Sequence, residues 1–270
     1  MPGTPSINRR DALLATAGLL TALSGCQSKT QETSVTTSEP ESPPDEQAIR
    51  DANIATLTKL GFTVAGSLPL WSKWTGKPIS LRPKIEICRR LMCSEVATAY
   101  IWSQTVPEEN LRAYIKRSQL MDSMAEVEHK IFATPREDAA QQFGNGDGWR
   151  QENQWGLAWV LGFDIEPGLT DGFITEKVMT PLVKDFMPAL DDSDKDFADR
   201  VQLRSLNEVF RKFDILYCAH NAVRSAQLGK PNVPDNFDST VDGGVIHEKR
   251  HSLTWCVSPG VKWDDTDLST

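Results

Sequence analysis

A cysteine shortly after a short apolar segment divides this chain into a leader, a polar linker and a domain. Arg9 and Arg10 precede the apolar residues 12–23, and Ser and Gly at 24–25 separate that segment from Cys26. A segment of this length suits the hydrophobic region of a signal peptide, whereas a helix that spans a bilayer needs about 20 apolar residues. The chain available for a folded domain therefore begins after residue 25.

The sequence Leu-Ser-Gly-Cys that ends at Cys26 resembles the bacterial lipobox, in which small residues admit the signal peptidase and the thiol accepts diacylglycerol. We expect residues 1–25 to be a signal peptide and Cys26 to carry the lipid. The pair Arg9 and Arg10 also resembles a twin-arginine signal without its preferred neighbours, so that route and general secretion both remain open. The predicted location is the cell membrane or outer membrane, with the lipid-anchored protein facing the periplasm or the exterior.

Residues 26–46 contain mainly Ser, Thr, Glu, Pro and Gln and almost no apolar side chain. Such a segment buries too little surface to offset the entropy of ordering, which predicts a flexible tether. Residues 47–270 remain as one domain. The formal net charge of −8 and the lack of a basic patch argue against nucleic acid as a partner.

Helical patterns dominate the domain, and neither a long alternation of apolar and polar residues nor an internal repeat is present. The sequence predicts a mainly α, single-domain, non-repeating helical bundle with a long irregular N-terminal loop over residues 61–82. The glycine-rich residues 143–148 predict a flexible turn. The predicted helices cover residues 45–60, 83–103, a segment from 107, a segment from 122, 149–161, 175–187, 197–228 (long enough for two helices) and 245–256.

Four cysteines fall within the domain, at Cys88, Cys93, Cys218 and Cys256. An exported protein can form disulfides, but Cys88 and Cys93 are five residues apart on a predicted helix, which is a poor distance for a bridge. Buried free thiols are favoured, and one disulfide remains an alternative.

Three stretches carry a family resemblance. They are residues 81–91 (Leu-Arg-Pro-Lys-Ile-Glu-Ile-Cys-Arg-Arg-Leu), residues 149–162 (from Trp-Arg-Gln-Glu to Leu-Gly), and an ordered series of motifs between 203 and 267 that includes His-Asn-Ala-Val-Arg at 220–224 and Glu-Lys-Arg-His-Ser-Leu-Thr-Trp at 248–255. Together they resemble the bacterial family called domain of unknown function 4272, over about residues 80–268. Asn221 and Lys249 depart from it, where tryptophan and arginine are usual. The family has no established activity, so the resemblance implies a fold and not a reaction.

Polar residues at helical spacing in the second half of the domain form the main candidate site. On one helix Asp214, Tyr217, His220 and Arg224 fall mostly on one face, and Arg150, Glu152 and Glu248 are candidates to join them. The functional interpretation is the wall of a pocket for a small polar ligand. The structural interpretation, which we favour, is a buried polar network that locks helices together, because buried charges require partners.

The sequence His247-Glu248-Lys249-Arg250-His251 matches the pattern H-E-x-x-H of zinc peptidases, whose two histidines lie on one helix face. The two cationic residues between them oppose a dication, and no third ligand follows at the usual spacing. A metal site at His247 and His251 is therefore disfavoured, and the alternative is a surface-facing helical turn in which Glu248 forms a salt bridge.

The sequence leaves the activity open. We expect a non-enzymatic, lipid-tethered domain that binds an unknown protein or a small molecule at the cell envelope, with no cofactor. The alternative is an uncharacterised hydrolase that uses Arg150, Glu152, His220 and Glu248, with or without zinc.

Overall fold

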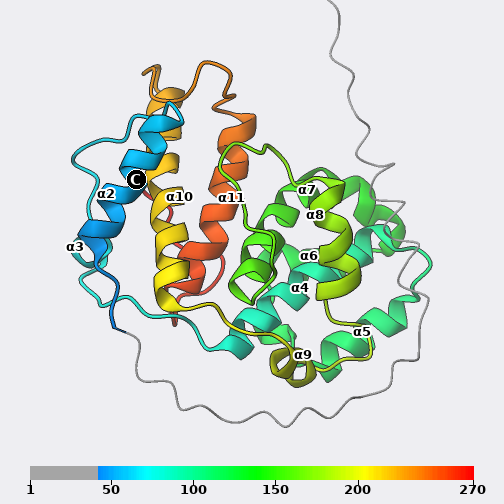
Figure 1. Cartoon of the computed structure of the whole chain (residues 1–270). Helices are drawn as coiled ribbons and strands as arrows, with labels where there is room; N and C mark the ends of the chain where they lie inside the picture. Colours follow the sequence, from blue (N-terminus) through cyan, green and yellow to red (C-terminus); the bar gives the residue numbers. More distant parts are fainter. Residues whose placement is uncertain (1–41) are drawn as a thin grey trace, which may run out of the picture.

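The computed structural model describes residues 42–270, and all regular structure in that part of the chain is helical (Figure 1). The α-helices are α2 (Glu46–Lys59), α3 (Trp71–Thr75), α4 (Lys84–Trp102), α5 (Glu108–Arg117), α6 (Glu126–Ala133), α7 (Arg136–Val160), α8 (Glu176–Pro181), α9 (Asp194–Arg200), α10 (Leu206–Gln227) and α11 (Val241–Cys256). A 3-10 helix, η1 (Met121–Ser123), precedes α6, and a π-helix, η2 (Leu182–Phe186), follows α8. The predicted mainly α, non-repeating bundle is confirmed.

The predicted signal peptide and Cys26 lie outside the described residues, as does most of the predicted tether. Within residues 42–270, no helix has both the length and the apolar character needed to cross a bilayer.

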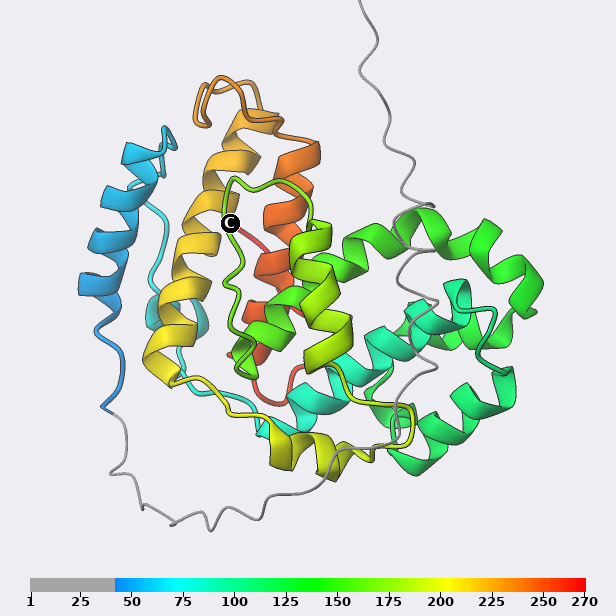
Figure 2. The same ribbon diagram turned by 45° about the vertical axis from the view of Figure 1, so that its right-hand side comes forward.

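Helices α7 and α11 form the centre of the fold. Helix α7 packs against α4 and α11, while α11 also packs against α10, which in turn contacts α2. Figures 1 and 2 show α2, α10 and α11 side by side in one half of the molecule, with α4, α5 and α6 in the other half. Side chains from both α7 and α10 therefore meet the faces of α11.

Glycines allow α11 to approach both neighbours closely. A Cβ atom added to Gly243 would lie 2.6 Å from Cγ1 of Val223 on α10, and one added to Gly244 would lie 2.5 Å from the Trp149 ring on α7. Further along the same contact, a Cβ atom on Gly156 would lie 2.1 Å from Ser252 Oγ. A larger residue at any of these positions would require the helices to move apart.

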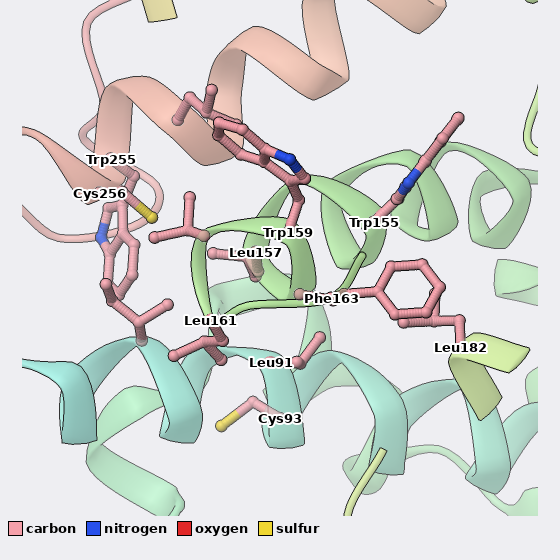
Figure 3. Packing of buried hydrophobic residues seen from close by; sticks show 14 of the residues in the cluster. Leu91, Cys93, Trp155, Leu157, Trp159, Leu161, Phe163, Leu182, Trp255 and Cys256 are labelled. Atoms are coloured by element: carbon pink, nitrogen blue, oxygen red, sulfur yellow. The ribbon is translucent and has the colours of Figure 1, made fainter. Parts of the chain in front are cut away.

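An apolar cluster fills the space between α4, α7 and α11 (Figure 3). Leu91 of α4 lies near Leu161 at the end of α7, and Leu157 and Trp255 approach from α7 and α11. These side chains are almost completely removed from solvent. At about 25 cal/mol per Å2 of buried apolar surface, such burial is the main favourable contribution to folding.

The helix starts predicted at residues 83 and 107 are confirmed, and the local causes of these starts and of the start of α10 are visible. Pro83 and Pro107 occupy the N-cap positions of α4 and α5, where a missing N–H costs nothing. Ser205 begins α10 through a capping box, because its Oγ accepts from the backbone N–H of Glu208 while the Glu208 side chain accepts from Ser205. The separate helices α9 and α10 resolve the long predicted segment 197–228 into two.

The predicted flexible turn over residues 143–148 is wrong, because these residues lie inside α7. Tertiary contacts hold the helix there despite its glycines. Gly144 lies against Trp102 of α4, where an added Cβ atom would be 2.8 Å from the ring. Asp147 accepts hydrogen bonds from Thr98 Oγ1 at 2.9 Å and from the Trp102 indole at 3.0 Å. Gly144 therefore allows close helix packing and does not form a turn.

Candidate functional site

Helices α10 and α11 bring four polar side chains together at their contact. Tyr217 and His220 come from α10, and His247 and Arg250 come from α11. His220 Nδ1 lies 2.5 Å from Arg250 Nη1, and His220 Nε2 lies 3.3 Å from His247 Nδ1. The ring of Tyr217 lies 4.8 Å from the Arg250 guanidinium carbon. We call these four residues the Arg250 cluster.

Arg250 is completely buried, yet the polar groups that it contacts are all neutral. Its Nη1 donates to Leu268 O at 2.8 Å and its Nη2 donates to Ser269 O at 2.9 Å. Among the described residues, no carboxylate lies within ion-pair distance of Arg250, and Asp267 acts on it only from further away. Burial lowers the pKa of Arg250 to about 10, so the guanidinium remains charged at neutral pH.

The arginine fixes the protonation of both histidines. A guanidinium can only donate, so His220 Nδ1 accepts and His220 Nε2 carries the proton. That N–H donates to His247 Nδ1, which must therefore be unprotonated. Burial, followed by the charges of Arg250 and His247, lowers the pKa of His220 to about 2. Burial and the Arg250 charge also lower the pKa of His247. Both rings are therefore neutral at physiological pH.

The C-terminal segment, residues 258–269, runs past this cluster and is held by arginines. Arg82 donates to Ser258 O at 2.6 Å and also to Val261 O. The Arg90 guanidinium carbon lies 4.7 Å from the centre of the Trp263 ring. Arg250 then holds the carbonyls of residues 268 and 269. The segment thereby covers the hydrogen-bonding edge of the Arg250 guanidinium.

Other predicted site residues are distributed over separate contacts. Asp214 accepts from Arg50 Nη2 at 2.7 Å and from Asn53 Nδ2 at 3.0 Å, which joins α10 to α2. Glu152 is completely buried and accepts from the backbone N–H of Ile174 at 2.7 Å, and its Oε2 lies 3.6 Å from Lys249 Nζ.

The remaining three predicted residues are less buried. Arg150 pairs with Asp147 within α7, and the exposed Arg224 bonds to Gln227 within α10. Glu248 is half-buried and accepts from Asn153 Nδ2 at 2.5 Å. Burial raises the pKa of Glu248, against the opposing effects of that hydrogen bond and of the Arg150 charge. Of the seven candidates, only Tyr217 and His220 thus lie in the Arg250 cluster.

The two histidines of the H-E-x-x-H pattern have different partners. His247 faces His220, whereas His251 Nε2 lies 3.1 Å from Trp263 O and its ring lies 4.2 Å from the Trp263 ring. Within residues 42–270, no group of three or more His, Cys, Asp or Glu side chains is placed to hold a metal ion.

The interpretation of this turn as surface-facing is wrong. Lys249 and Arg250 are both completely buried, because α11 is enclosed by α7, α10 and the C-terminal segment. Sequence reasoning missed Arg250 for this reason: a Lys-Arg pair within a polar run has the pattern of a solvated surface. Arg250 is buried and not solvated because of tertiary packing, which the local sequence does not reveal.

The four cysteines of the domain are free and buried. Burial raises the pKa of Cys88, Cys218 and Cys256 to about 12, and it also raises the pKa of Cys93. All four are therefore protonated at neutral pH and poor nucleophiles.

Comparison with known proteins gives one match. The model of a family described as "Domain of unknown function (DUF4272)" matches residues 50–266. That range includes most of α2 and extends through α11 into the C-terminal segment. No curated protein and no solved structure shows a significant match.

Proposed function

This chain belongs to the DUF4272 family, and on that premise we propose that it is an exported lipoprotein whose helical domain binds a small anionic molecule at the Arg250 cluster. The family itself has no known function, so support for the proposal comes from the leader sequence and from the surroundings of one buried cation.

The proposed anchoring rests on residues 1–26. Arg9, Arg10, the short apolar segment and the small residues before Cys26 together make a lipoprotein leader. Helix α2 begins at Glu46, which leaves a polar segment between Cys26 and the domain. A single acyl chain holds a protein at a membrane only weakly, so we expect more than one chain on the mature N-terminus.

We expect the native protein to sediment with membranes and to begin at Cys26, with the mass of a diacylglyceryl group added to its thiol. Mass spectrometry of the N-terminal peptide measures this directly. The Cys26→Ser variant should lose the lipid and appear in the soluble fraction, whereas Cys88→Ser, which changes a buried cysteine of α4, should remain lipidated. An intact N-terminus at Met1 without an acyl group on Cys26 would refute the anchoring.

Ligand binding is supported by the uncompensated charge of Arg250. A buried cation is costly unless an anion or several good acceptors accompany it. Here two backbone carbonyls and one histidine accept from the guanidinium, and none of them carries a charge. An anion with two oxygens would satisfy both Nη atoms in the bidentate geometry that arginine favours.

The surroundings of Arg250 suit a small ligand with a planar or apolar part. Trp74 stacks on Tyr217 with ring centres 5.3 Å apart, and both rings face the guanidinium. His247 is only half-buried, so the cluster approaches the surface at this residue. We propose that the ligand replaces the carbonyls of residues 268 and 269 and that the C-terminal segment moves aside when the ligand binds.

The binding test uses thermal unfolding of the full chain with Cys26→Ser in acetate, citrate, phosphate or sulfate, against chloride at equal ionic strength. At least one oxyanion should raise Tm saturably, because a ligand at 100 times its Kd stabilises the folded state by about 2.7 kcal/mol. For a domain of this size, each kcal/mol corresponds to about 2–4 °C in Tm. Arg250→Met should abolish the shift, and it should still fold because its partners are neutral.

Arg211→Met is the matched control, since it removes one positive charge from an exposed position of α10. It should keep the full anion-dependent shift. The absence of any shift beyond that in chloride, or an equal shift in Arg250→Met, would contradict the proposed ligand site.

A further inference from the structure

A groove of about 450 Å3 lies between α5, η1 and α6. Figures 1 and 2 show α5 and α6 in the half of the molecule away from α10 and α11, the helices that carry the Arg250 cluster. Its volume is within the range of small-molecule sites in proteins. None of the residues that the sequence singled out lies in this groove.

The lining of the groove is mainly apolar. Ile115 comes from α5, Met121 and Met124 come from η1 and the residue after it, and Phe132 comes from α6. Met121 has 53% of its surface exposed, which is high for a large apolar side chain. Methionine side chains adapt their shape to an apolar guest because they are flexible and polarisable. The floor therefore fits a flexible hydrocarbon chain.

The rim of the groove is cationic and polar. Lys116 and His129 are exposed, and among residues 42–270 neither side chain has a hydrogen-bond or ion-pair partner. Arg112 is instead tied to the groove wall, because it donates to Glu108 at 2.6 Å and to Phe132 O at 3.0 Å. In a protein of net charge −8, a free lysine beside an apolar floor provides a local site for a negative head group.

The side-chain amide of Gln119 also lines the groove, at a position where the backbone has an unusual conformation. Gln119 follows the C-cap of α5 with a φ of +52°, the conformation in which glycine is usual after a helix. The glutamine places a hydrogen-bonding side chain on the lining of the groove, which a glycine would lack.

We propose that this groove binds a single-chain amphiphile with an anionic head group, such as a fatty acid. The alkyl chain packs on Ile115, Met121, Met124 and Phe132, and the carboxylate lies beside Lys116. The proposal does not depend on the Arg250 cluster, which differs in location and in the ligand that it fits.

Calorimetric titration of the full chain with Cys26→Ser tests the groove, since this variant needs no detergent. The probes are dodecanoate below its micellar concentration, 1-dodecanol and hexanoate. Dodecanoate should bind with a stoichiometry of one, and hexanoate should bind at least tenfold more weakly, since each fully buried methylene contributes about fourfold in affinity.

Variants of the cationic rim and of the apolar lining test whether dodecanoate binds in the groove. Lys116→Glu should weaken dodecanoate binding at least fivefold while changing dodecanol binding less than twofold. Met124→Glu should remove binding of both, and a thermal melt of this half-buried position verifies that the variant is folded. Lys130→Glu, an exposed charge reversal on α6 that does not line the groove, should change affinity less than twofold.

Three outcomes would overturn the proposal: no saturable binding of dodecanoate, equal affinity in the wild type and in Met124→Glu, or binding of dodecanol as tight as that of dodecanoate. The last would leave an apolar groove without selection for an anionic head group.

Discussion

Replacing Arg50 with methionine should lower the free energy of unfolding by about 3–5 kcal/mol. Both members of the Arg50–Asp214 pair are buried, and Arg50 donates from Nε and Nη2 to the same carboxylate oxygen at 2.9 and 2.7 Å. In the variant the Asp214 carboxylate stays buried, and the side chain that still donates a strong hydrogen bond to it is Asn53, at 3.0 Å. Urea unfolding followed by circular dichroism measures the loss.

The double variant Arg50→Met/Asp214→Leu is the informative control for this pair. Because it leaves no charge behind, it should recover much of the lost stability. Arg200→Met breaks a partly exposed pair with Asp192 and should cost no more than about 1 kcal/mol. A loss in Arg50→Met as small as that in Arg200→Met would show that the pair does not lock α2 onto α10.

Replacing Gly162 with alanine should cost about 3 kcal/mol or more. Gly162 ends α7 with a φ of +101°, where a side chain is strained. An added Cβ atom would also lie 2.6 Å from the backbone oxygen of Gln202. That segment has little room to retreat, because the N–H of Arg204 donates to Val160 O at 2.9 Å. The same urea titration gives the magnitude.

Gly146→Ala is the matched control on the same helix. No atom lies within 4 Å of a Cβ built at Gly146, and its φ is not positive. Alanine should therefore leave stability unchanged or raise it by up to about 1 kcal/mol through helix propensity. A destabilised Gly146→Ala variant would argue against a continuous α7, and an unaffected Gly162→Ala variant would argue against the tight helix end.

Much of the helical framework was predictable because its signals are local. Pro83, Pro107 and the Ser205–Glu208 capping box act within one helical turn, and each marks a helix start in the structure. The continuity of α7 through residues 143–148 was not predictable, because it depends on Trp102 and Thr98 of another helix. Local propensity favours a turn there, and long-range contacts outweigh it.

The candidate site was only partly visible in the sequence for a related reason. Helical spacing identified Tyr217 and His220 as neighbours on α10, but it did not reveal which helix each residue faces. In the structure Asp214 faces α2, whereas His220 faces α11. Arg250 has no local signal of burial at all. Its role is determined by the packing of α10, α11 and the C-terminal segment.

The hydrogen bonds of Arg82 to α11 and the C-terminal segment also constrain the order of events during folding. Arg82 lies shortly before α4, and its acceptors are Trp255 O, Ser258 O and Val261 O, more than 170 positions later. Contacts of such long sequence separation slow folding, because a large loop must close before they form. This part of the fold therefore cannot be completed until residues 255–261 are available to accept from Arg82, and until then only nearer neighbours can cover the apolar face of α4.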